Sequence, residues 1–347
     1  MENVPILEIL LFIVGLGALI KGGNWFVDGA TGIAHRFHVP ELVIGATVVS
    51  IGTTLPEVMV STTSALRGVS SMAYGNAVGS VICNTALIAA LTVAVRPSRV
   101  DRKTLAAPVG FFFATAILFS AVAVTTGFFS RTVGVILLLT FAAYVSYVAW
   151  NEGRNQDAAE SSLGADAEAD ADVRGEEYRL GDKSRLLGIE LPRTAIHCIF
   201  LVVGAVLIAC GATLLVNNGT VIATWLGVPD SVIALTFIAL GTSLPELTTA
   251  VTALVKGHSS LSLGNIIGAN ILNLALVSGT AITICPFPVP TDSVIGGVNA
   301  SLAVDLPVML VSMAILTLPA LVRGRLSRWQ GVLLLALYAV FCVLQFV

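Results

Sequence analysis

Charged side chains are scarce in this sequence. Lys, Arg, Asp and Glu together make up 11% of its 347 residues, whereas hydrophobic residues make up 56% and the mean hydropathy is +0.92. A soluble domain of this length could not cover so much apolar surface, so the composition predicts an all-α polytopic membrane protein. The formal net charge of −3 gives no indication of a nucleic-acid partner, because the acidic residues are concentrated in one stretch.

Cysteine is also rare, and the five cysteines lie in apolar segments without paired spacing. This pattern favours small hydrophobic side chains buried among helices over disulfides or metal ligands. The five residues are Cys83, Cys198, Cys210, Cys285 and Cys342.

The sequence does contain an internal duplication. The hexapeptide Gly-Thr-Thr-Leu-Pro-Glu at 52–57 returns as Gly-Thr-Ser-Leu-Pro-Glu at 241–246, 189 residues later. With the same offset, 18 of 46 positions are identical between 40–85 and 229–274. Matches at Pro, Glu, Gly and Asn are not expected between unrelated apolar segments, so the two stretches are copies of one unit.

Ten apolar segments are long enough to cross a bilayer as helices, which takes about 20 residues each. They lie near 5–33, 42–66, 72–95, 104–126, 131–150, 194–217, 231–255, 260–284, 303–322 and 328–346. Five fall in each copy, so we predict ten transmembrane helices in two repeats, 1–150 and 194–347, joined by an acidic linker at 151–193. Residues 151–192 hold eleven of the 21 acids without apolar periodicity, which predicts a mostly disordered or loosely helical segment. The spacing of these acids matches no EF-hand loop, so a solvated linker is favoured over a regulatory calcium site.

Basic residues predict the orientation of these segments. If the N-terminus lies outside, the cytoplasmic loops hold 15 of the 18 Lys and Arg residues, and such an excess marks the cytoplasmic side. We therefore predict that both termini lie outside and that the linker is cytoplasmic. Because each copy has an odd number of helices, the second copy is inverted, which places Arg67 outside and its counterpart Lys256 inside. Inverted repeats with a site at their interface are typical of secondary transporters.

Each hexapeptide contains a proline, which cannot donate a backbone hydrogen bond. Pro56 frees the carbonyl oxygen of Gly52 and Pro245 frees that of Gly241, so we predict that both helices kink or break there. Inside a membrane, freed backbone groups are tolerated only where they are buried in protein or line a hydrated cavity.

A glutamate follows each proline and shares its helix face with other oxygen-bearing groups. One carboxylate near mid-bilayer, at a cost of about 2.5–3.5 kcal/mol, could be protonated or could merely join helices. Two that are related by duplication and flanked by hydroxyls are expected to be ligands of a hard cation. Ca2+ accepts about 6–8 oxygens in flexible geometry, whereas Mg2+ requires an octahedron, so the set favours Ca2+. No His or Cys lies on these faces, which disfavours soft metals. The grouped residues are Glu57, Thr53, Ser50, Ser80 and Asn84 in the first copy, and Glu246, Thr242, the backbone of Ala239, Ala269 and Asn273 in the second.

The two motif regions, 45–85 and 234–274, resemble the alpha repeats of the sodium/calcium exchangers in the cation/calcium antiporter superfamily, most of all its compact prokaryotic members. The resemblance implies Ca2+ ligands at Thr53, Glu57, Thr242 and Glu246. It implies Na+ ligands at Ser50, Thr54, Glu57, Ser80, Asn84, Ala239, Ser243, Glu246 and Asn273. Two positions depart from the prokaryotic pattern: Ala269 replaces a serine, and Asn273 stands where an aspartate is common.

Sequence and resemblance together predict an antiporter, not an enzyme, that exchanges Ca2+ for Na+ by alternating access. We expect a multi-pass protein of the plasma membrane that acts as a monomer, needs no cofactor, and has Ca2+, Na+ and the lipid bilayer as its partners. A Ca2+/H+ or other monovalent-coupled antiporter stays open, because two close carboxylates can carry protons. A passive cation channel is disfavoured by inverted repeats around a charge-balanced site. Transport assays with imposed ion gradients would distinguish a Ca2+/H+ antiporter from a Ca2+/Na+ antiporter. Measurements of single-channel conductance would identify a channel.

Overall fold

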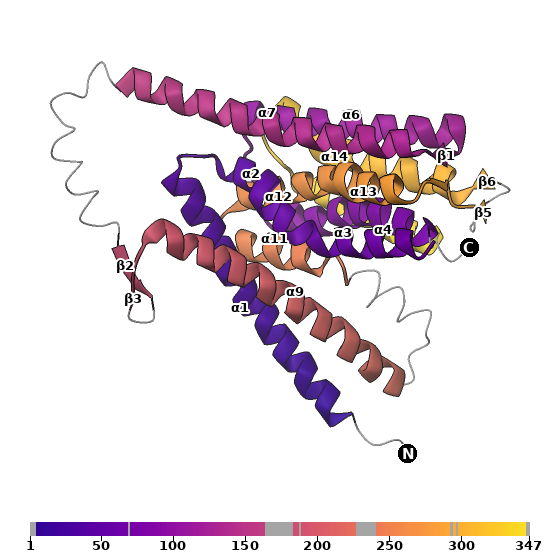
Figure 1. The fold of residues 1–347 in the computed structure, drawn as a ribbon, viewed down its shortest axis with the longest axis horizontal. Coiled ribbons are helices and arrows are strands. Elements are labelled where there is room, and N and C mark those ends of the chain that lie inside the picture. Colours follow the sequence, from indigo (N-terminus) through magenta and orange to yellow (C-terminus); the bar gives the residue numbers. More distant parts are fainter. Residues whose placement is uncertain are drawn as a thin grey trace.

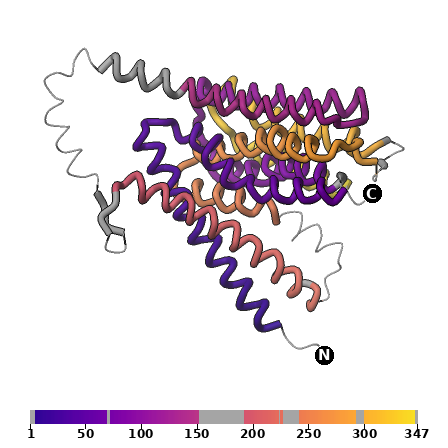
Figure 2. The backbone as a smooth tube through the Cα atoms, viewed as in Figure 1, coloured from indigo at the N-terminus to yellow at the C-terminus, as the bar shows by residue number. Residues whose placement is uncertain are grey.

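The structure is a computed structural model that describes residues 5–68, 70–163, 183–186, 189–226, 241–291, 294–295 and 298–344. Its described part is built almost entirely from helices (Figures 1 and 2). In the first half they are α1 (Ile6–Arg36), α2 (Glu41–Ile44), α3 (Ser50–Leu66), α4 (Ser70–Ile82), α5 (Ala90–Val95), α6 (Arg102–Thr126) and α7 (Arg131–Leu163). In the second half they are α9 (Arg193–Trp225), α11 (Leu244–Lys256), α12 (Ser259–Leu272), α13 (Ser278–Ile284), α14 (Leu306–Arg323) and α15 (Arg328–Leu344).

Short π-helical turns interrupt several of the long helices without ending them. They are η1 (Gly45–Val49), η2 (Cys83–Ala89), η4 (Asn273–Val277) and η5 (Ser301–Asp305). Three antiparallel two-stranded ribbons complete the described structure. They pair β1 (Phe128–Phe129) with β4 (Phe287–Pro288), β2 (Lys183–Leu186) with β3 (Ile189–Pro192), and β5 (Val294–Ile295) with β6 (Val298–Asn299).

Eight of the ten predicted segments correspond to helices long and apolar enough to cross a membrane. They are Ile6–Arg36, Glu41–Leu66, Met72–Val95, Arg102–Thr126, Arg131–Asn151, Arg193–Ile222, Ser259–Ile284 and Ser301–Arg323. The tenth segment corresponds to α15, which has 17 residues, and the end of the seventh to α11, which has 13. The helical membrane fold is thus confirmed, whereas the count of ten spans in two repeats stays a prediction. Within the predicted linker, α7 continues to Leu163 and β2–β3 forms a hairpin, while 164–182 lie outside the described residues.

Helices α1 and α9 pack side by side along their lengths and project from the remaining helices (Figure 1). Their glycines allow close approach, because a Cβ on Gly15 would lie 3.0 Å from the carbonyl oxygen of Gly211, and one on Gly22 would lie 2.9 Å from that of Gly204. The 189-residue offset relates Gly15 to Gly204 and Gly22 to Gly211, so each of these two contacts is the counterpart of the other. Such reciprocity is what a two-fold relation between the halves predicts.

The exposed outer surface of α9 overturns part of the cysteine prediction. Cys83 is buried, but Cys198 and Cys210 on α9 are exposed, because this helix packs mainly against α1 and leaves its other side open. All five cysteines carry free thiols in the structure.

Helix α12 lies at the centre of the main helical body. Every side chain from Leu261 to Leu272 is buried, and α12 packs against α2, η1, α3, α6 and α11. A Cβ on Gly268 would lie 2.5 Å from the carbonyl oxygen of Ala46 and 2.6 Å from Ser50 Oγ. Only glycine permits this approach, which brings the first motif region against α12 of the second motif region.

The loops gather at two opposite ends of the helices. At one end, Arg96 donates to the carbonyl oxygen of Leu254, Arg99 pairs with Arg325 in a backbone bridge, and the loops before α2 and α12 meet. At the other end, β1 pairs with β4, and Arg131 donates to the carbonyl oxygen of Thr283. The loops predicted to be cytoplasmic thus share one end with the linker, which follows α7.

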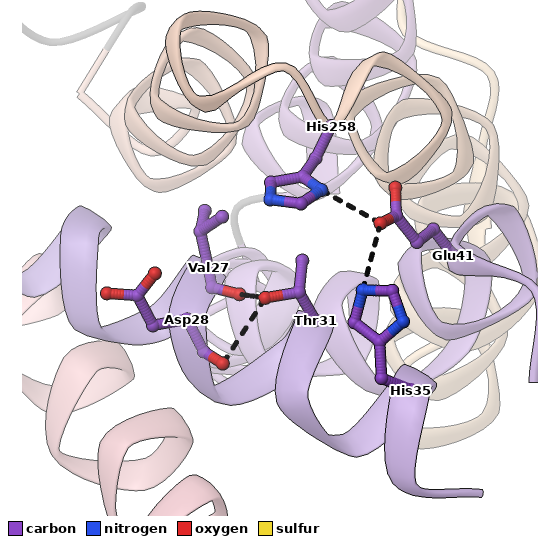
Figure 3. A network of polar contacts seen from close by, with 6 residues as sticks. All are labelled: Val27, Asp28, Thr31, His35, Glu41 and His258. Carbon is purple, nitrogen blue, oxygen red and sulfur yellow. Dashed lines mark hydrogen bonds and ion pairs between the residues drawn. The ribbon is translucent and has the colours of Figure 1, made fainter. Parts of the chain in front are cut away.

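Polar contacts hold α1 to the main body at the linker end (Figure 3). Glu41 Oε1 lies 2.8 Å from Nδ1 of His258 and 3.9 Å from Nε2 of His35. Lys256 Nζ lies 2.7 Å from Asp28 Oδ1 and donates to the carbonyl oxygen of Asn24 at 3.0 Å. These contacts join α1 to α2 and to the short connection between α11 and α12.

Candidate functional site

The two repeated glutamates are brought together inside the protein. Glu57 lies in α3 and Glu246 in the first turn of α11, and both side chains are 0% exposed. Thr54 Oγ1, one turn before Glu57, donates to Glu246 Oε1 at 3.4 Å. The duplicated motifs therefore form one site, although they lie 189 residues apart in the chain.

Several buried oxygens at this site have no hydrogen-bond partner among the described residues. Both carboxylate oxygens of Glu57, Oε2 of Glu246 and Oγ of Ser243 are in this position. The side-chain amides of Asn84 and Asn273 also lack partners within that part of the chain. Buried polar groups in native proteins are nearly always paired, and unpaired ones call for an explanation such as an ion. An oxygen-rich site that binds a cation supplies that explanation.

Most of the remaining predicted ligands are buried in the protein interior. Ser50, Thr53 and Thr54 on α3 are buried, as are Ser80 on α4, Asn84 in η2, Ser243 before α11 and Asn273 in η4. Ser50 Oγ donates to the carbonyl oxygen of Thr47 at 3.0 Å, and Thr53 Oγ1 lies 3.2 Å from Asn265 Oδ1. Thr242 is partly exposed in the turn before α11. Ala239 lies outside the described residues.

The two prolines have different effects. Helix α3 continues through Pro56, so of the predicted kink or break the structure excludes the break there. Proline lacks an N–H, so within α3 the carbonyl oxygen of Gly52 loses its helical donor. In the second copy, Gly241–Ser243 form a turn and α11 begins at Leu244, with Pro245 in its first turn. Proline suits that place, because the amides of the first turn have no helical acceptor.

The two asparagines predicted as Na+ ligands each lie in a π-helical turn. Asn84 lies in η2 and Asn273 begins η4, so both copies carry the irregularity at the same position. A π-turn changes the helical hydrogen-bond register and is frequent at functional sites. No residue type in the sequence signals such a turn, and we did not predict it.

Two further asparagines support the site and were not predicted as site residues. Asn76 Nδ2 donates to the carbonyl oxygen of Glu57 at 3.2 Å and to Ser61 Oγ at 2.8 Å. Asn265, its counterpart in the second copy, contacts Thr53. Both belong to the repeated Gly-Asn pair, so the duplication contained the signal that would have identified them.

A cavity of about 520 Å³ flanks the site between α3, α9 and the start of α11. Gly52, Pro56, Gly241, Thr242 and Pro245 line it on the side of the glutamates. Its other wall is α9, from Ala205 to Asn217. Because α3 and α9 both run away from the linker end, these residues lie in the middle and in the half of the protein remote from the linker.

The donor set is made of two carboxylates with neutral oxygens. No group of three or more His, Cys, Asp or Glu residues that could hold a metal ion occurs among the described residues. A site with two negative charges suits one divalent cation or two monovalent cations bound reversibly. Either species would neutralise the carboxylate pair.

Comparisons with known proteins agree with this chemistry. A family model described as sodium/calcium exchanger protein matches residues 7–150 and 196–347. The sodium/calcium exchanger MaX1 of Methanosarcina acetivorans is 30% identical, with 97% of this chain and 98% of that protein covered. An uncharacterized membrane protein of Methanocaldococcus jannaschii is 32% identical, with coverage of 96% and 97%. A solved structure of the sodium-calcium exchanger NCX_Mj, soaked with Na+ and Sr2+, is 29% identical with a TM-score of 0.76, covering 97% of this chain and 98% of that one.

Proposed function

Because this chain belongs to the sodium/calcium exchanger family, we propose that it is a secondary active antiporter that exchanges Ca2+ for Na+. The observation that carries the proposal is the pair of buried glutamates with unpaired oxygens, donated by the two copies of one motif. Two negative charges in a dry environment need a counter-charge. One Ca2+ or two Na+ supply it equally well, so the two ions compete for one site.

The proposed ligands divide between the two ions. Glu57 and Glu246, with the backbone carbonyls of Thr53 and Thr242, bind Ca2+, which prefers many oxygens in flexible geometry. Na+ uses the same glutamates together with neutral oxygens. These are provided by Ser50, Thr54, Ser80, Asn84, Ala239, Ser243 and Asn273.

Alternating access follows from the division of the molecule into two bodies. The α1–α9 pair packs through glycines and moves past the main body, which holds the site. The cavity beside the site lies in the half remote from the linker, whereas polar contacts tie α1 to the main body at the linker end. We infer that access opens from the remote side, although neither glutamate lines the cavity and both are fully buried in the described conformation. Movement of α1 and α9 would close that cavity and break the contacts at the opposite end.

Obligatory exchange has an electrostatic cause. The empty site carries two uncompensated carboxylates, and each costs about 2.5–3.5 kcal/mol in the middle of a membrane. This cost resists movement of the empty protein, whereas occupancy by Ca2+ or Na+ removes it. The repeats are inverted, so the same rearrangement opens the site to either side.

The proposed setting is the plasma membrane, with both termini outside and the linker in the cytoplasm, as the distribution of basic loops predicts. The protein acts as a monomer, because the site is formed entirely within one chain.

Uptake of 45Ca2+ into proteoliposomes tests the function, with Na+, K+ or H+ gradients imposed one at a time. We expect an outward Na+ gradient to drive uptake, and K+ and H+ gradients of the same size to drive none. Calcium flux that ignores Na+ and follows the pH gradient would replace the proposal with a proton-coupled antiporter.

A further inference from the structure

Four arginines converge on one pocket at the linker end of the protein. Arg99 and Arg102 come from the connection between α5 and α6, and Arg323 and Arg325 from the connection between α14 and α15. The pocket has a volume of about 670 Å³, and Gly324 completes its lining. All four arginine side chains are exposed. This arginine pocket is separate from the glutamate site and has no part in the proposed exchange.

The backbone holds the two connections together and fixes the arginines. Arg99 and Arg325 face each other in an antiparallel bridge. Val100 donates to the carbonyl oxygen of Gly324 at 3.0 Å, and Leu326 donates to that of Ser98 at 2.8 Å. Gly324 has a φ of +66°, which glycine adopts without strain, and this turn brings Arg323 and Arg325 into one pocket.

The positive charge of the pocket is uncompensated by the described residues. Like charges directly opposite on paired strands are destabilising, and Arg99 and Arg325 are such a pair. None of the four arginines forms an ion pair or a hydrogen bond with a described side chain. Asp101 is adjacent, but its carboxylate caps α6 through Thr104 and Lys103, and these hydrogen bonds hold its pKa below the usual range.

Exposed apolar residues lie close in the chain to the arginines of the pocket. Helix α5 ends at Val95, which is 60% exposed, and Val322 before the pocket is 72% exposed. Trp329, 45% exposed, begins α15 on the same side, and tryptophan is enriched where membrane meets water. Val95 and Val322 stand at the ends of two helices long and apolar enough to cross a membrane, a few residues from these arginines in the chain, so we expect the arginines at the level of lipid headgroups.

We propose that the arginine pocket binds the phosphate headgroup of an anionic phospholipid, whose acyl chains cover the apolar surface at Val95 and Val322. Basic pockets between transmembrane helices at the membrane surface have the chemistry to bind such headgroups. Guanidinium groups pair with phosphate through two parallel hydrogen bonds, which suits a site built from arginine alone. The acidic linker is the competing occupant, but a soluble peptide segment would leave the apolar surface uncovered.

The test uses the full-length protein in phosphatidylcholine nanodiscs, titrated with phosphatidylglycerol and analysed by native mass spectrometry for bound lipid. One basic residue near an anionic surface contributes about fivefold in affinity, so Arg99→Gln with Arg325→Gln is expected to weaken binding about thirtyfold. The double variant Arg99→Lys with Arg325→Lys retains the charge and is expected to retain most of the binding. The control variant, Arg67→Gln with Arg131→Gln, removes two exposed charges at the opposite end and is expected to bind as the wild type does.

Three outcomes would overturn the proposal. One is equal binding by the wild type and the Arg99→Gln/Arg325→Gln variant. Another is displacement of phosphatidylglycerol by inorganic phosphate at the same concentration, which would identify a site for soluble anions. The third is binding that occurs only after Asp166, Glu168, Asp170 and Asp172 are replaced by their amides, which would make the linker the occupant.

Discussion

Two fully buried glutamates decide the chemistry of this protein. Each ionised carboxylate costs about 2.5–3.5 kcal/mol at mid-bilayer, so the pair costs about 5–7 kcal/mol, which is comparable to the total stability of many proteins. Thr54 donates a single weak hydrogen bond to Glu246, and the side chain of Glu57 receives none from the described residues. Neutral hydrogen bonds therefore do not offset this cost. A bound cation does, and this comparison favours a transport site over a purely structural role.

Ala269 gives the first prediction at the residue scale. Its side chain is buried beside the site on α12 and carries no oxygen. If Na+ sites need neutral oxygens to replace the hydration shell, a water takes the missing place with weaker binding. We expect Ala269→Ser to lower the half-saturating Na+ concentration while the Ca2+ affinity stays nearly unchanged. The measurement is Na+-driven Ca2+ efflux from vesicles against external Na+, and an unchanged Na+ dependence would contradict it.

The sequence predicts the residues of the site strongly, because duplication doubles every signal. Glu57 and Glu246 each follow a proline in a repeated hexapeptide, and the structure places Thr54 against Glu246. The supporting contacts were less visible. Asn76 acts through the backbone of Glu57, a contact between separate helices that spacing along one helix does not reveal.

At the scale of elements, the glycines of α1 explain how two long helices pack against each other. A Cβ on Gly22 would lie 2.8 Å from Leu207 Cβ on α9, whereas a Cβ on Gly17, in the same helix, would meet no atom within 4 Å. The two positions thus form a matched pair that differs only in contact with α9.

We predict that Gly22→Ala impairs exchange and lowers thermal stability, while Gly17→Ala does not. Overpacking costs about 1–3 kcal/mol, whereas the gain in helix propensity of about 0.5–1 kcal/mol is common to both variants. The difference in stability and exchange between the two variants therefore measures the effect of the contact with α9. Thermal unfolding in detergent and 45Ca2+ exchange in vesicles are the measurements, and equal behaviour of the two variants would show that the α1–α9 contact is unimportant.

Element boundaries were predictable where apolar length decided them and less so where the backbone departs from a regular helix. The predicted span 131–150 agrees with Arg131–Asn151, yet the helix itself continues to Leu163. The π-turns at Asn84 and Asn273 are not marked by any characteristic residue types. Such turns depend on how the central helices pack together, and the sequence of a single segment does not reveal that packing.

At the scale of the whole molecule, the distribution of charges predicts which end of the protein faces each side of the membrane. Arg131 belongs to the end remote from the linker, where it contacts Thr283, and the linker belongs to the end with the basic loops. In a variant without native cysteines, a cysteine at position 131 is expected to react with an impermeant thiol reagent added outside. One at position 165 is expected to react only after permeabilisation. Labelling of position 165 from outside would reverse the orientation.

The central claim is that Ca2+ crosses the membrane through the site formed by Glu57 and Glu246, in exchange for Na+. The most direct measurement is Na+-gradient-driven 45Ca2+ uptake by proteoliposomes that contain wild type, Glu57→Gln, Glu246→Gln or the control Glu8→Gln, at equal amounts of folded protein. Glutamine keeps the shape but removes one of the two charges that face a divalent ion in a low-dielectric site, so both site variants are expected to lose at least about tenfold in rate. Glu8 lies near the start of α1, away from the site, and Glu8→Gln is expected to transport as the wild type does. Near-normal uptake by either site variant would show that these glutamates are structural and would contradict the account.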